Sequence, residues 1–223
     1  MSISTSSDAI YQVLEKEIID LAIKPGSSIS ESELCNRFHV SRTPIRSVLQ
    51  RLQENGLVNI TPYKGTTVTL LDFDIINQII YQRVAVETMV IRDFMSICNP
   101  MLLEKIRYAV RRSEILIEGD FEVSDFYDID SQMHEIWFHE TNKPYLWDLI
   151  QKSQSNYSRF RMLDIVEVHN FKEIVSEHRE LLDIIKRKDV PAIEPLLSKH
   201  LYGGITRLGC RLYTEFKDYF VRK

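Results

Sequence analysis

The stretch that decides the fold of this chain spans residues 38–58 and reads Phe38-His-Val-Ser-Arg-Thr-Pro-Ile-Arg-Ser-Val-Leu-Gln-Arg-Leu-Gln-Glu-Asn-Gly-Leu-Val58. Ser41 or Thr43 can cap a helix here, and Pro44 falls in its first turn, where a missing N–H costs nothing. Gly56 follows the last turn, where a left-handed residue is favoured. Apolar residues recur at helical spacing and predict one buried stripe, formed by Ile45, Val48, Leu49 and Leu52. We predict the turn and second helix of a helix-turn-helix.

The exposed side of this predicted helix carries Arg42, Thr43 and Arg46, with Arg51 further along. A helix that enters the DNA major groove places its N-terminal residues on base edges, and Arg reads guanine with two hydrogen bonds. The alternative is a surface helix that merely carries arginines. The neighbouring segments favour the DNA-binding interpretation.

Two predicted helices precede this stretch. Residues 8–22 show an amphipathic pattern that ends at Pro25-Gly26. Ser30 and Glu33 have the spacing of a capping box and open a short helix. The order of elements therefore favours a compact three-helix DNA-binding domain.

A predicted β-hairpin follows Gly56. Two β-rich runs, 57–60 and 66–70, flank a turn that contains Lys64 and Gly65. A hairpin directly after a recognition helix is a wing, where Lys64 can meet phosphate and Gly65 allows close backbone approach. The hairpin can also close the small core, and the two roles are compatible.

Charge is unevenly distributed along the chain. The formal net charge is −4, yet residues 1–70 carry seven Lys/Arg against seven Asp/Glu. Within 34–66 the basic residues Arg37, Arg42, Arg46, Arg51 and Lys64 face one acid, Glu54. A local basic face can bind phosphates while the acidic remainder limits non-specific binding.

These motifs resemble the DNA-binding domain of the GntR family of bacterial transcription regulators, over about residues 8–70. The resemblance rests above all on Val40-Ser-Arg-Thr-Pro-Ile-Arg46 and Leu52-x-x-x-Gly-Leu-Val58. It implies that Arg42, Thr43 and Arg46 contact the operator, and that Lys64 and Gly65 do so from the wing.

The rest of the chain reads as helical after a joint at 71–74. We predict helices near 75–98, 101–118, 122–141, 144–164, 170–188 and 192–219, with a kink or break at Gly203-Gly204. The expected fold is mainly α: a winged helix-turn-helix domain in 1–70, a linker in 71–74, and an all-α bundle in 75–223.

Sequence features also indicate the compartment. No run of eighteen apolar residues occurs, and the N-terminus has neither the basic nor the apolar region of a signal peptide. Cys35, Cys98 and Cys210 are odd in number and lack C-x-x-C spacing, which favours reduced thiols. We expect a cytoplasmic protein without membrane association.

One Asp and three His form a candidate metal site. Asp130 and His134 stand four residues apart and therefore share a helix face, while His178 and His200 lie among apolar residues of later helices. Such residues on separate helices of a bundle could bind a first-row divalent metal. A His on an apolar face is more often a hydrogen-bonded core residue, so spacing alone leaves both interpretations open.

Residues 75–210 resemble the FCD effector domain of the FadR subfamily. The matching segments are Asp130-x-x-x-His134, Asn142-Lys-Pro-Tyr-Leu146, Glu177-His-Arg-Glu-Leu-Leu-Asp-Ile-Ile185 and Lys199-His200-Leu201. The resemblance implies a helical bundle in which Asp130, His134, His178 and His200 bind a divalent metal, which helps to hold a small carboxylate. Met133 departs from the usual aromatic residue before the His.

An anionic effector needs a cation beside the metal. Arg83 matches the Arg-x-x-x-Glu of the first bundle helix in this family and could clamp a carboxylate, or it could pair with Glu87 at i,i+4. Asn156 and Arg159 are further effector-binding candidates.

The sequence therefore predicts a homodimeric DNA-binding transcription regulator, of the repressor type, that reads a palindromic operator and responds to a small organic acid. Its expected cofactor is one divalent ion per chain (Zn, Ni, Mn, Co or Fe). A metal-ion sensor would use the same residues. A metal-dependent enzyme with an added DNA-binding domain is a further alternative, but the sequence offers no separate general base beside the ligands.

Overall fold

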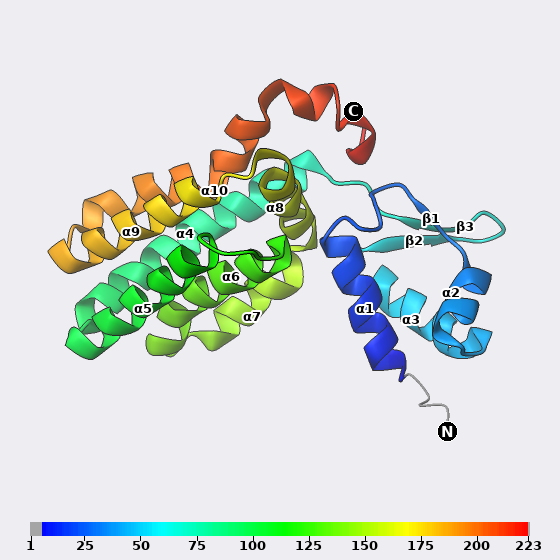
Figure 1. The fold of residues 1–223 in the computed structure, drawn as a ribbon, viewed down its shortest axis with the longest axis horizontal. Helices are drawn as coiled ribbons and strands as arrows, with labels where there is room; N and C mark the ends of the chain where they lie inside the picture. The colour runs from blue at the N-terminus through cyan, green and yellow to red at the C-terminus, as the bar shows by residue number, and fades with distance from the viewer. Residues whose placement is uncertain (1–5, 223) are drawn as a thin grey trace. The chain divides into compact units, whose positions relative to one another are not determined.

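The computed structural model describes residues 6–222 and shows a mainly helical protein with one small sheet (Figure 1). Contacts divide it into two compact units. The first comprises the described residues up to Ile76, together with Ser155–Met162 and the residues from Cys210 on. The second comprises Asn77–Gln154 and Leu163–Gly209. The predicted fold class is confirmed, whereas the predicted domain boundary at 71–74 stays a prediction.

The first unit contains the winged helix. Its helices are α1 (Ser7–Ile19), α2 (Glu31–Phe38) and α3 (Arg42–Glu54), and its strands are β1 (Ser28–Ile29), β2 (Val58–Thr61) and β3 (Gly65–Val68). The sheet is antiparallel in the order β1-β3-β2. Strand β1 was not predicted, because two residues are too few to show an alternating pattern.

Local signals define the start of α2 and the end of the recognition helix α3. The predicted side-chain cap at the start of α3 was wrong, because Ser41 occupies the N-cap position without a side-chain capping hydrogen bond. The Ser30 side chain accepts a hydrogen bond from the Glu33 N–H at 3.3 Å, which caps α2. Gly56 adopts φ +70°, and the Leu57 N–H bonds the Leu52 carbonyl at 2.9 Å. This bond closes a Schellman motif after α3, so the chain leaves the helix directly into the wing.

The buried stripe of α3 packs into the core of the winged helix. Ile45, Val48 and Leu52 are fully buried, together with Leu14 and Ile18 of α1. Burial of one face of α3 fixes the opposite face toward solvent, where its polar side chains lie.

Seven helices form the remainder: α4 (Phe73–Ile97), α5 (Pro100–Leu116), α6 (Val123–Glu140), α7 (Pro144–Ser153), α8 (Ser155–Val168), α9 (Phe171–Arg187) and α10 (Ile193–Leu208). The predicted single helix over 144–164 was wrong, since the structure breaks it at Gln154. The last predicted helix also extended too far. It continues through Gly203-Gly204 and ends at Gly209, whose φ is +48°.

The C-terminal residues form a strap along the chain segment that follows the wing. After two short 3-10 turns, Gly209–Tyr213 and Lys217–Tyr219, the strap pairs with Leu71. The Leu71 N–H bonds the Tyr219 carbonyl at 2.8 Å, and the Val221 N–H bonds the Leu71 carbonyl at 2.9 Å. The rings of Phe73 and Phe220 meet edge to face.

The first turns of α8 hold the same segment. The Arg159 guanidinium donates to the Thr69 carbonyl at 2.7 Å, and Asn156 accepts from the Asp72 N–H at 3.1 Å. Residues 69–72 are therefore tied by main-chain and side-chain hydrogen bonds from two other parts of the first unit.

We expect Phe220→Ala to lower the free energy of unfolding by about 3 kcal/mol, because the nearly buried ring would leave a cavity beside Phe73. Tyr213→Ala is a matched control on the same strap. Tyr213 is 75% exposed, so its removal should change stability by less than about 0.5 kcal/mol. Urea unfolding followed by circular dichroism measures both. An effect of Phe220→Ala as small as that expected for Tyr213→Ala would show that the Phe220 ring does not stabilise the unit.

Candidate DNA interface and metal centre

The N-terminal turn of α3 presents the predicted DNA-contacting residues to solvent. Arg42 and Thr43 are exposed at the first positions of the helix. Arg46 lies one turn further and pairs with Glu31 of α2 at 3.1 Å, in a contact that leaves its side chain 65% exposed. An exposed ion pair of this kind contributes at most about 1 kcal/mol, so phosphate or base contacts can replace it.

The other predicted DNA-binding residues lie in two places. Arg37 pairs with Glu17, and Arg51 donates to Asp8 at 2.6 Å, so both arginines bind acids of α1. The wing tip carries Lys64 and Gly65, where Gly65 adopts φ +100°. Only a residue without Cβ accepts that conformation without strain.

Side chains from three helices converge in the second unit. Asp130 and His134 of α6, His178 of α9 and His200 of α10 each offer a ligand atom, and these atoms lie within 4.8 Å of one another. His178 Nε2 is 3.4 Å from Asp130 Oδ1, and His134 Nε2 is 3.9 Å from Asp130 Oδ2. The structure thus brings together all four residues that the sequence singled out.

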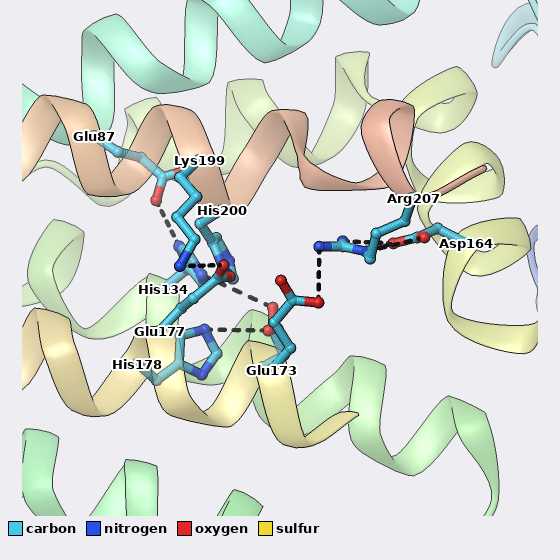
Figure 2. A network of polar contacts seen from close by, with 10 residues as sticks. Glu87, His134, Asp164, Glu173, Glu177, His178, Lys199, His200 and Arg207 are labelled. Atoms are coloured by element: carbon cyan, nitrogen blue, oxygen red, sulfur yellow. Dashed lines mark hydrogen bonds and ion pairs between the residues drawn. The ribbon is translucent and has the colours of Figure 1, made fainter. Parts of the chain in front are cut away.

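Two carboxylates orient the imidazole rings from behind. Glu87 of α4 lies 2.6 Å from His134 Nδ1, and Glu177 of α9 lies 2.9 Å from His200 Nδ1 (Figure 2). A carboxylate at Nδ1 keeps the proton there and leaves Nε2 free to bind a metal. His134 Nε2 accordingly has no hydrogen-bond partner among residues 6–222.

Each carboxylate has its own cation. Arg83 donates to Glu87 at 2.7 Å within the core, and Lys199 lies 3.4 Å from Glu177 at the surface. Burial alone would raise the pKa of Glu87, but Arg83 and His134 outweigh it and lower that pKa to about 2. Glu177 shows the same balance: burial raises its pKa, while His200 and Lys199 bring it below the ordinary value. Both groups are therefore anionic at neutral pH.

The ligand set fits a divalent ion. Burial lowers the pKa of His200, which favours the neutral imidazole that metals require. The Asp130 side chain is 1% exposed, and a carboxylate this deeply buried needs a cation or a hydrogen-bond donor nearby. Three imidazoles and one carboxylate suit zinc, nickel, manganese, cobalt or iron.

The predicted effector residues do not all lie at this centre. Arg83 is buried and pairs with Glu87, which is the i,i+4 contact that the sequence allowed as an alternative. Asn156 and Arg159 bind residues 69–72 in the first unit, as described above. Their roles in effector binding stay predictions.

Sequence reasoning missed Glu87 and Glu177 as partners of the ligands. Glu87 was considered only as the partner of Arg83. Glu177 precedes the ligand His178 in sequence but bonds His200 of the next helix, and no spacing rule indicates that contact.

A winged helix with an exposed basic recognition helix, joined to a helical bundle with a buried His/Asp cluster, is the architecture of a class of DNA-binding proteins. Comparison with known families agrees. Residues 6–68 match the model of the bacterial regulatory proteins of the gntR family, and residues 78–203 match the FCD domain. The chain belongs to the GntR family and carries an FCD domain. It is a DNA-binding transcription regulator and not an enzyme.

Curated relatives carry regulator names. The HTH-type transcriptional repressor RspR of Escherichia coli K12 is 27% identical over 192 residues, which cover 86% of this chain and 84% of RspR. The galactonate operon transcriptional repressor of the same organism is 25% identical over 223 residues, with coverage of 91% and 96%.

Solved structures show the same fold. A GntR regulator from Rhodococcus sp. RHA1 has a TM-score of 0.71 at 21% identity and covers 91% of this chain and 97% of its own. McbR/YncC of E. coli has a TM-score of 0.70 at 19% identity, with coverage of 94% and 98%. Among the described residues, no helix has the length and hydropathy needed to cross a membrane.

We expect Glu87→Gln to weaken metal binding by about 10- to 100-fold, because an amide orients His134 less strongly than a carboxylate. Glu177→Gln should also weaken metal binding. The exposed Lys199, which pairs with Glu177, stays solvated when it loses this partner. The matched control is Glu135→Gln, which is next to His134 in sequence but contacts the exposed His139. Competition with a chromogenic chelator measures the affinities. Equal affinities for all four proteins would contradict the orienting role.

Proposed function

We propose that this regulator is a homodimeric repressor whose affinity for a palindromic operator is set by a small carboxylate bound beside a divalent ion. The observation that carries this proposal is the cluster of Asp130, His134, His178 and His200, together with the carboxylates behind two of the rings. The printed names of two relatives support repression. One of them is named for an operon of galactonate, which is itself a carboxylate.

The charge of the centre favours an anionic effector. Arg83 balances Glu87, and Lys199 balances Glu177, so these four residues contribute no net charge. Asp130 alone opposes the two positive charges of the ion. A net charge near +1 would remain in a buried place, where it attracts a carboxylate far more strongly than in water.

Each group of candidate residues has its own proposed role. Asp130 and the three His would hold the ion, and the ion would supply a Lewis-acidic position for a carboxylate oxygen. Arg83 is the proposed protein contact of the effector beside the ion, and Asn156 and Arg159 stay candidate effector residues within the first unit. Lys64 and Gly65 of the wing would join Arg42, Thr43 and Arg46 at the operator, with Arg37 and Arg51 on the flanking phosphates.

Regulation requires two arrangements of the dimer. The effector must bind the DNA-competent and the incompetent arrangement with different affinity, because equal affinities shift no equilibrium. We propose a winged-helix domain in residues 1–70, a linker in 71–74 and an effector-binding and dimerisation domain in 75–223. Such a regulator works in the cytoplasm, where the bacterial chromosome lies.

A second candidate is a metal sensor, in which the ion itself is the effector. It is favoured by the depth of the cluster, since the side chains of Asp130, His134 and His178 are at most 2% exposed. The same cluster serves both functions, so an experiment that separates metal from carboxylate decides between them.

The deciding experiment measures metal content and operator affinity together. Elemental analysis of untagged protein should give about one divalent ion per chain, and His134→Ala should lose it. A double-stranded site selected from a random library then reports affinity by fluorescence anisotropy for apo protein, metallated protein, and metallated protein with a panel of small carboxylates. A change that needs metal plus a carboxylate supports the proposal. A change with metal alone supports the sensor, and absence of metal after incubation with several ions would overturn both.

We expect Arg42→Ala and Arg46→Ala each to weaken binding to the selected site by about 10- to 100-fold, since one bidentate base contact contributes about 1–3 kcal/mol of discrimination. Both side chains are exposed, so the thermal midpoint should stay unchanged. Arg187→Ala at the exposed end of α9 controls for the loss of one charge. Unchanged affinity in both α3 variants would remove these residues from the interface.

A further inference from the structure

An exposed apolar stripe runs along α5 and has no role in the sites above. Met101, Tyr108 and Ile115 are 74%, 67% and 59% exposed. They stand seven residues apart, which places all three on one side of the helix. Single exposed apolar residues are ordinary, but three large ones in a row indicate a surface that is covered by something.

A groove opens beside this stripe. It lies between α5 and α6, which run side by side in the second unit (Figure 1), and has a volume of about 430 Å³. Tyr108 and Arg112 line it from α5, whereas Glu135 and Ile136 line it from α6. The face thus joins an exposed apolar stripe to a neighbouring groove, and Tyr108 belongs to both.

The two helices of this face carry opposite charge. Helix α5 has four Lys/Arg and two Glu, while α6 has five Asp/Glu and neither Lys nor Arg. Of the acids of α6, Asp130 is buried and Glu140 pairs with Lys105 of α5, so the other three supply the negative charge that a partner would meet. The acids of α6 at its outer side include Asp128 and Glu135, seven residues apart. The basic residues of α5 include Arg111 and Arg112, which follow Tyr108 by three and four residues, one helical turn away.

This charge pattern is self-complementary. In a two-fold symmetric contact, the same patch meets itself, and α5 of each copy can lie against α6 of the other. Helices of 17 and 18 residues are about 26 Å long, and two of them side by side span roughly 20 Å. Such a face matches, in order of magnitude, the roughly 800 Å² that each partner contributes to a standard interface.

We propose that the α5–α6 face, defined by Met101, Tyr108 and Ile115 with the charged side chains around them, binds a second copy of this chain, with α5 against α6 of the partner. This inference rests on the homodimer of the proposed function and specifies its interface. Helix α6 also carries the metal ligands Asp130 and His134 on its inner side. A shift of α6 at the metal centre would therefore act directly on the contact between the subunits.

Two charge-reversed chains test this arrangement. The first carries Arg111→Glu and Arg112→Glu on α5, and the second carries Asp128→Lys and Glu135→Lys on α6. Each should place like charges across both halves of its own symmetric contact and raise the dimer dissociation constant by about a hundredfold or more. When the two are mixed, each acidic α5 meets a basic α6, and each basic α5 meets an acidic α6.

Light scattering at micromolar concentration and native mass spectrometry give the readout. The wild type should have twice the chain mass of 26.2 kDa, each variant should be monomeric, and the equimolar mixture should restore a dimer that contains one of each. The matched control carries Lys186→Glu and Arg187→Glu at the end of α9 and should remain dimeric. Circular dichroism establishes that all chains are folded.

Several results would overturn the proposal. Both variants could stay dimeric, or two folded monomers could fail to pair when mixed. A monomeric α5 variant beside a dimeric α6 variant would indicate that α5 packs on α5 of the partner instead. Loss of the dimer in Met89→Glu alone would place the contact on the groove between α4 and α10. A monomeric wild type that binds its selected site would contradict the proposed dimer itself.

Discussion

The second unit depends on two hydrogen bonds between a carboxylate and an imidazole, one buried and one partly buried. Glu87 joins α4 to α6 through His134, and Glu177 joins α9 to α10 through His200. A buried carboxylate without a partner would cost several kcal/mol, so these pairs fix how the helices face one another. The same two bonds hold His134 and His200 where each offers a ligand atom within 4.8 Å of one on Asp130. The hydrogen bonds that fix how these helices pack therefore also orient the imidazole rings of the candidate metal centre.

The four candidate metal ligands could be predicted from the sequence, but the carboxylates that orient their rings could not. Asp130 and His134 share a helix face by simple periodicity, and His178 and His200 lie among apolar residues of later helices. The family resemblance then favoured metal binding over a role as core residues. The partner of each ring depends on which helices become neighbours, and that is a tertiary property. Glu177 illustrates the difference, because it is next to the candidate ligand His178 in sequence while its hydrogen bond goes to His200 of the next helix.

The fold shows a similar boundary between local and tertiary information. Helix ends with their own chemistry were predictable, as the capped start of α2 and the Gly56 turn after α3 show. The break at Gln154 and the C-terminal strap were not. The hydrogen bonds of the strap and of the first turns of α8 go to residues 69–72. No local pattern identifies Arg159 as the donor to the Thr69 carbonyl. The role of Arg159 in effector binding stays a prediction beside this contact.

Helix α6 takes part in the candidate metal centre on one side and in the proposed subunit contact on the other. This arrangement can couple effector binding to DNA binding. Its inner side contributes Asp130 and His134 to the candidate metal centre, while its outer side lies on the face proposed to meet the second subunit. A helix transmits displacement along its length because its main-chain hydrogen bonds resist deformation. Recognition of a palindrome requires the two recognition helices to match half-sites about 34 Å apart, so a small shift at the subunit contact changes the fit on DNA. An effector that pulls α6 toward α9 and α10 would therefore be read out as operator affinity.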